Sequence, residues 1–186
     1  MKDHQMRIIG IDPGMAITGY SVLDVDDNEN TSRASKATSS TCSSPDSQRF
    51  SIVCSGSIQT NKQLDVSSRL LEIHNDLIEL VNTYKPDIAS IEQLFFFKNA
   101  KTIMPVAEAR GVIIMTFRMH NIPVYEYTPL VVKQTITGYG RADKDDVKEV
   151  IKLMLNNEDI PKLDDTTDAI AIALCHVHQN DFCKSI

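Results

Sequence analysis

The sequence predicts an α/β domain with a central mixed sheet of five strands flanked by helices. Two observations support this prediction: three strand-like stretches come first in the chain, and two later ones lie between stretches with helical spacing. Consecutive strands pair antiparallel through short turns, whereas a strand reached through a helix runs parallel to its neighbour. At 186 residues the chain is long enough to form a single domain with its own apolar core.

The composition is that of an ordinary globular protein, with 42% hydrophobic and 24% charged residues. The net charge of −6 excludes a polycation that binds nucleic acid by charge alone. The first residues lack the apolar core of a signal peptide, and no apolar run approaches the roughly 18–20 residues of a membrane span. The four cysteines form no CxxC pair. We therefore expect a cytoplasmic protein with free thiols and no membrane contact.

The first predicted strand is the apolar run Arg7–Asp12, which Pro13 and Gly14 end. Three isoleucines lead to Asp12, so this carboxylate is placed where a buried strand meets solvent. The alternating stretch Ile17–Val25 is expected to pair with it as a hairpin, and Phe50–Gln59 has strand character again.

A polar segment, Asp26–Arg49, separates the second and third predicted strands. It is rich in Ser, Thr, Asp and Asn and holds little apolar side chain. Such a composition cannot bury enough surface to offset the entropy of ordering. We predict a disordered insertion at 26–49 within one domain spanning 1–186. A tolerated insertion is favoured over a flexible arm or a phosphorylation target, because surface insertions are energetically cheap.

The remainder alternates helices with short strands. Leucine, isoleucine and valine recur at helical spacing from Ser67 to Tyr84, with Ser67 or Ser68 as a possible N-cap. Asp87–Glu92 and Val124–Tyr127 are short strands, and a helix lies between them, from about Lys101 or Pro105 to His120.

Cap signals define the last three helices. Thr128 followed by Pro129 predicts a helix start, and Gly138 predicts its end. Asp143 is a candidate cap for the next helix, and the last helix is expected to begin near Asp164 and Asp165.

Four acidic residues occupy the ends of predicted buried strands or the start of a predicted helix, where a charge is not needed for solubility. Asp12 and Glu92 each end an apolar strand, and Asp165 and Asp168 lie on one face of the last helix's first turn. If these carboxylates met, they would repel one another unless their pKa values rose or cations bound them. Oxygen ligands without nearby His or Cys favour Mg²⁺ or Mn²⁺ over zinc. Two such ions are a common device for phosphodiester hydrolysis, although spacing alone does not show that the four residues meet.

Five ordered blocks resemble one protein family. They are Ile9–Gly14 with Thr18–Tyr20, Ile91–Phe95 with Lys98–Ala100, Glu108–Gly111, Val132–Thr135 with Gly138–Gly140, and Asp165–Ala173. Together they resemble the RuvC family of Holliday junction resolvases, whose core is an RNase H-like fold. The resemblance covers nearly the whole chain except Asp26–Arg49, where the family pattern has a compact hairpin.

The resemblance implies that Asp12, Glu92, Asp165 and Asp168 are catalytic residues that hold Mg²⁺, with Mn²⁺ able to substitute. It further implies that the chain nicks four-way junctions symmetrically, as a homodimer, in recombination and repair, with a branch-migration helicase as partner. The helix Val112–Met119 is the candidate dimer interface; packing on the sheet is its other possible role.

The resemblance also implies contacts with DNA. The residues concerned are Phe95, Lys98, Lys133 and Lys144. Phe95 is the residue expected to stack on an unpaired base, although Phe96 and Phe97 beside it leave that choice open. Lys133 and Lys144 are expected to contact phosphates. Without the resemblance, solubility and intrahelical pairing on solvated helix faces would be the favoured explanation of these lysines.

Three alternatives remain at this point. The motif at Gly10–Gly14 followed by Thr18-Gly19 also resembles the phosphate loop of actin-like kinases, which need two lobes that 186 residues cannot supply. A non-enzymatic junction-binding scaffold would use the carboxylates only structurally. Cys175, His176 and His178 could suggest a metal, but a helix-end cluster without a fourth ligand is more often incidental.

Overall fold

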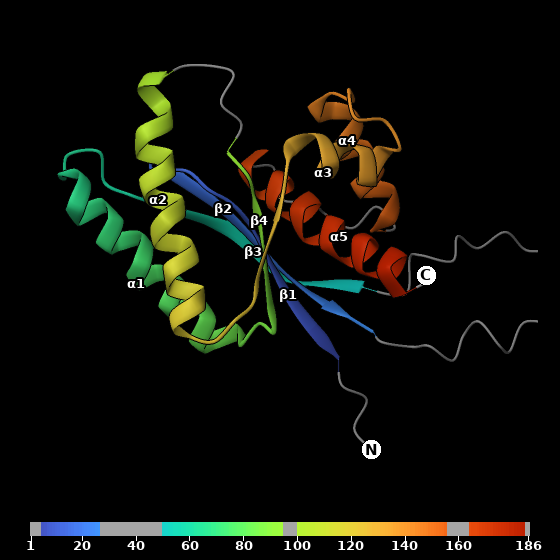
Figure 1. Ribbon diagram of the computed structural model, residues 1–186, viewed down its shortest axis with the longest axis horizontal. Helices are drawn as coiled ribbons and strands as arrows, with labels where there is room; N and C mark the ends of the chain where they lie inside the picture. The colour runs from blue at the N-terminus through green and yellow to red at the C-terminus, as the bar shows by residue number, and fades with distance from the viewer. Residues whose placement is uncertain (1–4, 27–49, 95–99, 156–163, 185–186) are drawn as a thin grey trace, which may run out of the picture.

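The computed structural model describes residues 5–26, 50–94, 100–155 and 164–184. The predicted insertion lies outside these ranges from residue 27 to 49, and so do Phe95 and Lys98. Within the described ranges the chain forms one sheet between two helical layers (Figure 1). None of the helices described there is long and apolar enough to cross a membrane.

The sheet has the five strands that the sequence predicts. They are β1 (Met6–Asp12), β2 (Ile17–Val25), β3 (Phe50–Gln59), β4 (Ile88–Glu92) and β5 (Val124–Tyr127). The spatial order is β3-β2-β1-β4-β5, with β1–β2 and β2–β3 antiparallel and β1–β4 and β4–β5 parallel. The mixed sheet is therefore confirmed, and β1 lies at its centre.

Helices cover both faces of the sheet. On one face lie α1 (Val66–Tyr84) and α2 (Ala100–Met119); on the other lie α3 (Pro129–Thr137), α4 (Lys144–Met154) and α5 (Asp164–Lys184) (Figure 1). Alternation along β1 separates the two cores: Ile9 and Ile11 face α1 and α2, whereas Ile8 faces α5. Gly10 and Asp12 lie on the same face of β1 as Ile8 and therefore also point toward α5.

The local signals at helix ends are mostly confirmed. Thr128 caps α3, Gly138 ends it in a left-handed conformation, and Asp143 forms a capping box at the start of α4. The cap predicted for α1 is wrong: Asp65, not Ser67 or Ser68, is the N-cap. The Asp65 carboxylate accepts hydrogen bonds from both serine hydroxyls and from a backbone N–H, and an ionised acceptor binds these donors more strongly than a hydroxyl does.

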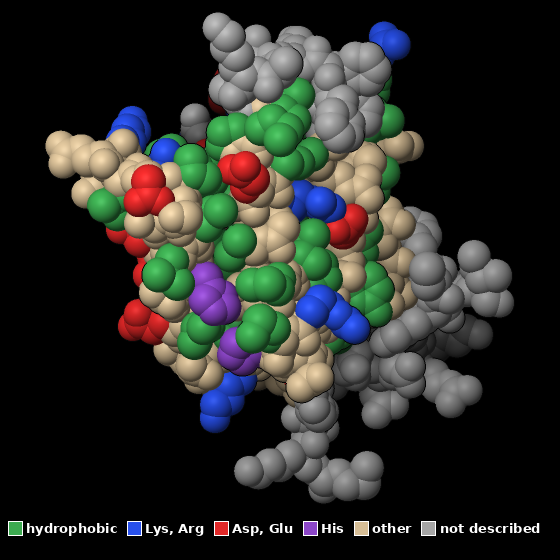
Figure 2. Space-filling model, turned by 60° about the vertical axis from the view of Figure 1, so that its left-hand side comes forward, with side chains coloured by type: hydrophobic (Ala, Val, Ile, Leu, Met, Phe, Trp, Pro, Cys, Tyr) green, Lys and Arg blue, Asp and Glu red, His purple; other side chains and the backbone are tan. Residues whose placement is uncertain are grey.

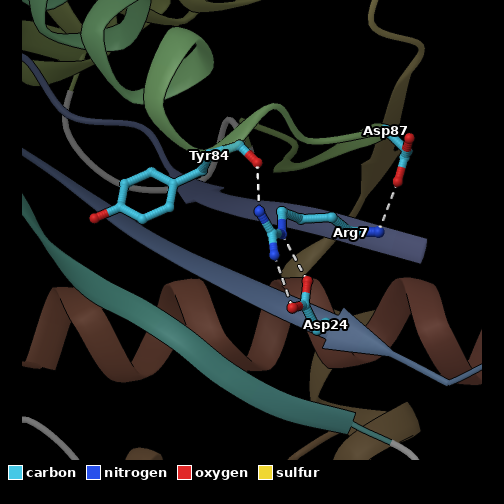
Figure 3. Close-up of polar contacts among 4 residues, drawn as sticks. All are labelled: Arg7, Asp24, Tyr84 and Asp87. Atoms are coloured by element: carbon cyan, nitrogen blue, oxygen red, sulfur yellow. Dashed lines mark hydrogen bonds and ion pairs between the residues drawn. The ribbon is translucent and has the colours of Figure 1, made fainter. Parts of the chain in front are cut away.

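Arg7 fastens the start of β1 to three other elements (Figure 3). Its guanidinium donates to both carboxylate oxygens of Asp24 on β2, Nε to Oδ1 at 2.6 Å and Nη2 to Oδ2 at 2.8 Å. Nη1 donates to the Tyr84 carbonyl at the end of α1, and the Arg7 backbone N–H donates to Asp87 before β4. The bidentate partner Asp24 raises the pKa of Arg7 further, so this anchor stays charged at any physiological pH.

Small residues let α5 lie directly on the sheet. A Cβ on Gly10 would come within 2.2 Å of the Ala169 carbonyl oxygen, and one on Gly19 within 2.1 Å of the Asp165 carbonyl oxygen. On β4 the Ser90 hydroxyl donates to the Ile172 carbonyl at 2.8 Å. Helix α5 therefore crosses β2, β1 and β4 at backbone-contact distance, and its first turn lies over the ends of β1 and β2.

Replacing Gly10 by alanine should destabilise the protein by about 1–3 kcal/mol, because the new methyl group overlaps the α5 backbone. For a chain of this size that corresponds to a melting temperature lower by roughly 2–12 °C in thermal unfolding. Gly111→Ala on α2 is the matched control, since nothing lies within 4 Å of its added Cβ. It should be neutral or slightly stabilising. Equal melting temperatures for the two variants would contradict the close approach of α5.

Candidate active site

Asp12 and Glu92 lie side by side at one end of the sheet. Their strands, β1 and β4, are parallel neighbours with Ile11 paired to Ile91, so the two carboxylates follow at the same level. Strand alternation directs both onto the face that α5 covers. The strand-end placement predicted from the sequence is thus found, and the two residues meet across 80 positions of chain.

Helix α5 brings the other two carboxylates to this end. Gly19 is the β2 partner of Asp12, and its Cα faces the Asp165 backbone, so the helix begins beside Asp12. Asp165 and Asp168 are in its first turn. The partial positive charge of a helix N-terminus stabilises anions there, which eases the gathering of negative charge.

A hollow of about 300 Å³ opens between these elements. Its polar lining consists of Asp12, Glu92, Asp168, Lys133 and Lys144. Apolar side chains complete the wall: Pro129, Val132, Val147, Ala171 and Ile172. Asp165 does not line this hollow, although its charge acts on Asp12. Three of the four predicted carboxylates therefore surround one space, and the fourth lies next to it.

The carboxyl group of Asp12 is hard to ionise in the absence of metal. Burial, and then the negative charges of Glu92, Asp168 and Asp165, raise its pKa to about 8, while Lys144 acts in the opposite direction. This group is therefore held in a place where it needs a cation to become charged at neutral pH.

Glu92 behaves in the same way. Burial and the charge of Asp168 raise its pKa to about 7, against the lowering effects of Lys144 and Lys133. Shifts of this size, from burial together with like charge in a cleft, are characteristic of functional sites.

Two lysines supply the positive charge of the hollow. Lys144, the first residue of α4, places Nζ 2.6 Å from Oδ2 of Asp168. Lys133 on α3 instead donates to the Ala142 carbonyl at 2.7 Å, which fastens α3 to the turn before α4. Both were predicted from the sequence to contact DNA phosphates; the structure places them beside the carboxylates, and the DNA contact stays a prediction.

The residues present suit a hard divalent cation. The acidic donors around the hollow are carboxylate oxygens, which Mg²⁺ and Mn²⁺ favour. Among the residues that the structure describes, no three His, Cys, Asp or Glu side chains already stand close enough to hold one ion. Mg²⁺ commonly binds through one or two carboxylates and completes its coordination with water and substrate oxygens.

His176 and Cys175, near the C-terminal part of α5, contact neighbouring elements of the fold. His176 is buried, and its Nδ1 lies 2.7 Å from the Tyr127 hydroxyl, with the Tyr125 ring beside it. Cys175 is buried with its Sγ 3.7 Å from the Thr135 hydroxyl. These contacts connect α5 to β5 and α3.

The ion pair between Arg110 on α2 and Glu126 on β5 was not predicted from the sequence. It fixes the strand next to Glu92 from the opposite face of the sheet, where Gln93 also contacts Glu126. Its residues carry no distinctive spacing, so only the Glu108–Gly111 block could have drawn attention to Arg110.

Comparison with known proteins places the chain among DNA-junction nucleases. The family model described as crossover junction endodeoxyribonuclease RuvC matches residues 34–176. A RuvC protein of Caldicellulosiruptor saccharolyticus is 43% identical over 172 residues, which is 92% of each chain. One of Alkaliphilus metalliredigens is 41% identical, over 95% of this chain and 96% of its own.

Solved structures give the same result. Thermus thermophilus RuvC superposes with a TM-score of 0.77 at 25% identity, over 95% of this chain and 96% of its own, and the same figures hold for its complex with a Holliday junction substrate. The RNase H-like fold predicted from the sequence is confirmed. By its match to the family model and its identity with these relatives, the chain belongs to the RuvC family of crossover junction endodeoxyribonucleases.

Proposed function

We propose that this protein resolves Holliday junctions by metal-dependent, symmetric nicking of two DNA strands, in homologous recombination and DNA repair. The observation that carries the proposal is the hollow at the sheet end, where Asp12, Glu92 and Asp168 meet in a chain of the RuvC family. A relative from Thermus thermophilus has been solved with a Holliday junction substrate, which supports the choice of DNA.

Asp12, Glu92, Asp165 and Asp168 would hold Mg²⁺, with Mn²⁺ able to substitute. The bound ions would supply an activated water and stabilise the leaving oxygen of the phosphodiester. Asp12 and Glu92 give up their protons when a cation binds, because it removes the repulsion that raises their pKa values. Val132 and Val147 form an apolar wall that limits water around the reacting phosphate and strengthens the charge interactions there.

Positive side chains would receive the DNA backbone around this centre. Lys144 has an exposed side chain at the rim of the hollow, and Lys133 lies on its wall. Phe95 and Lys98, the other predicted DNA contacts, follow the Glu92 strand but lie outside the described residues. Phosphate contacts of this kind make binding weaken as salt rises.

Asp12→Asn should abolish nicking of a synthetic four-way junction in Mg²⁺ while leaving junction binding within a few-fold of the wild type. Asparagine keeps the shape but removes the charge that holds the cation; a loss of about 4 kcal/mol of transition-state stabilisation is a thousandfold loss in rate. Gel-based nicking and fluorescence-anisotropy binding measure the two effects separately.

Asp145→Asn is the matched control, because this aspartate is exposed in the first turn of α4 and does not line the hollow. It should nick at the wild-type rate. Cleavage by the Asp12→Asn variant at a comparable rate would reject the mechanism. Junction binding without nicking by the wild type, with and without Mg²⁺, would favour the non-enzymatic scaffold.

Stability without metal should fall as pH rises, because of Asp12. Its folded pKa of about 8 lies above the ordinary value of 3.8, so between these limits the unfolded chain releases the proton first and gains relative stability. Asp12→Asn lacks this proton. In EDTA the variant should therefore become more stable relative to the wild type from pH 5 to pH 8, by about 3–4 kcal/mol or roughly 6–16 °C in melting temperature.

Addition of Mg²⁺ at pH 8 should stabilise the wild type and reduce that difference, because the cation binds the folded carboxylate. The Asp145→Asn variant should follow the wild type at every pH. A pH-independent difference between Asp12→Asn and the wild type would show that Asp12 ionises normally in the folded protein.

The homodimer implied by the family resemblance has a candidate surface on α2. Met104, Gly111, Met115 and Met119 recur along one side of this helix and are exposed, whereas Ala109, Ile113 and Phe117 on the other side are buried against the sheet. Hydrophobic side chains are spread over the face formed by α1 and α2 (Figure 2). A two-fold dimer through this face would offer two equivalent sites to the two strands of a junction.

The proposed function also includes a branch-migration helicase as a further partner and a cytoplasmic location.

Met115→Glu combined with Met119→Glu should convert the dimer into a monomer in analytical ultracentrifugation, because charge would be buried in the interface. The monomer should nick one strand without the coordinated second cut. Leu153→Glu is the control: Leu153 is equally exposed but lies on α4, over the other face of the sheet. A dimeric double variant would exclude this surface as the interface.

A further inference from the structure

One acidic residue of the active site already has a cation. The Lys144 ammonium lies 2.6 Å from Oδ2 of Asp168. The lysine is held there by the backbone, because it begins α4 directly after the Asp143 capping box, in which Asp143 and Asp146 each accept a backbone N–H of the other. The capping box therefore fixes the backbone position from which the Lys144 side chain reaches Asp168.

This contact places a positive charge on a carboxylate that a metal ion would need. A divalent cation binds carboxylate oxygens at about 2.0–2.6 Å, so an ion bound to Asp168 would lie close to the Lys144 ammonium, and the two like charges would repel. The same lysine also acts electrostatically on Asp12 and Glu92, which lie across the hollow. Its charge thus reaches three of the four carboxylates.

The ion pair is nevertheless easy to break. The Lys144 side chain is 66% exposed, and Asp168, its partner in the ion pair, is 28% exposed. Ion pairs of this exposure contribute little to stability. A phosphate that enters the hollow can offer the ammonium an equally good partner, at little cost to the fold.

We propose that Lys144 and a divalent cation compete for Asp168, so that the metal site stays incomplete until a DNA phosphate draws the ammonium away. The inference rests on the proposed function and names how metal and DNA binding are coupled. A junction that removes Lys144 from Asp168 raises the affinity for the metal, and by linkage the metal raises the affinity for the junction.

Lys133 provides a comparison within the same hollow. Its charge also acts on Glu92, but its Nζ donates to the Ala142 carbonyl and not to a carboxylate. Removing Lys133 therefore removes a nearby positive charge without vacating a carboxylate oxygen.

The first experiment measures Mg²⁺ binding without DNA, by isothermal titration calorimetry and by thermal stabilisation. Lys144→Met should bind Mg²⁺ about tenfold more tightly than the wild type, as expected for loss of a cation that competes at contact distance. Lys133→Met should gain clearly less. Lys152→Met, an exposed lysine in the last turn of the same helix, should not differ from the wild type.

A double-mutant cycle separates competition from long-range repulsion. In an Asp168→Asn background the ammonium has lost its Asp168 partner and acts only at longer range on Asp12 and Glu92, so adding Lys144→Met should raise Mg²⁺ affinity no more than Lys133→Met does in the wild type. A full tenfold gain in this background, or no gain from Lys144→Met alone, overturns the proposal. Circular dichroism and melting temperatures confirm that each variant is folded.

The second experiment measures junction binding in EDTA. Lys144→Met should weaken binding several-fold and lower the slope of log affinity against log salt by about one, because one phosphate contact is lost. An unchanged slope overturns the part of the proposal in which DNA takes the ammonium.

The two proposals can fail separately. Mg²⁺-dependent nicking by the wild type, together with unchanged Mg²⁺ affinity in Lys144→Met, rejects the competition and leaves the nuclease function standing. Absence of nicking rejects the function, whereas the DNA-free measurements of Mg²⁺ affinity still decide whether Lys144 competes for Asp168.

Discussion

The close approach of α5 to β1 and β2 is the contact on which the active site depends. Because Gly10 and Gly19 carry no side chain, the helix backbone rests on the strands, and its first turn reaches the end of β1. Any larger residue at these glycines would lift the helix and with it Asp165 and Asp168. Large side chains such as Ile8, Leu23 and Ile170 fill this core, and Val132, Val147 and Ile172 both belong to it and line the hollow.

This arrangement places like charges together in a half-buried space, which opposes folding. Burial and repulsion leave Asp12 and Glu92 with pKa values of about 8 and 7, so the fold carries an unfavourable term that a cation would remove. The two apolar cores on either side of β1 must outweigh it. The site is thus strained electrostatically before any ligand arrives, as is usual where function and stability compete.

Much of this could be predicted from local pattern. Buried runs that end in Asp12 and Glu92, and the cap signals at Thr128 and Asp143, depend on short stretches of chain, and the strands and helices they mark are present. The N-cap of α1 was predicted as Ser67 or Ser68, but the Asp65 side chain, two residues earlier, accepts the capping hydrogen bond from the Ser68 backbone N–H. The contacts of Lys133 and Lys144 could not be predicted, since the first depends on the path of the chain between α3 and α4 and the second on how α4 lies against α5. Local pattern did not predict that the four carboxylates form one site or which substrate they act on. Both expectations came from the family resemblance.

The two ends of β1 show how ion pairs can differ in role. Arg7 and Asp12 are five positions apart, about 17 Å along a strand. At one end the Arg7 side chain makes a bidentate pair with Asp24 on β2 and a hydrogen bond to the end of α1, so its loss would disturb the contacts among three elements. Near the other end, Lys144 on α4 pairs with Asp168 on α5, and the lysine side chain is mostly exposed. A bidentate, partly buried pair contributes more to stability than an exposed one, which solvent screens. The ion pair at the start of β1 therefore fastens the fold, whereas the pair beside Asp12 can be broken at little cost to stability.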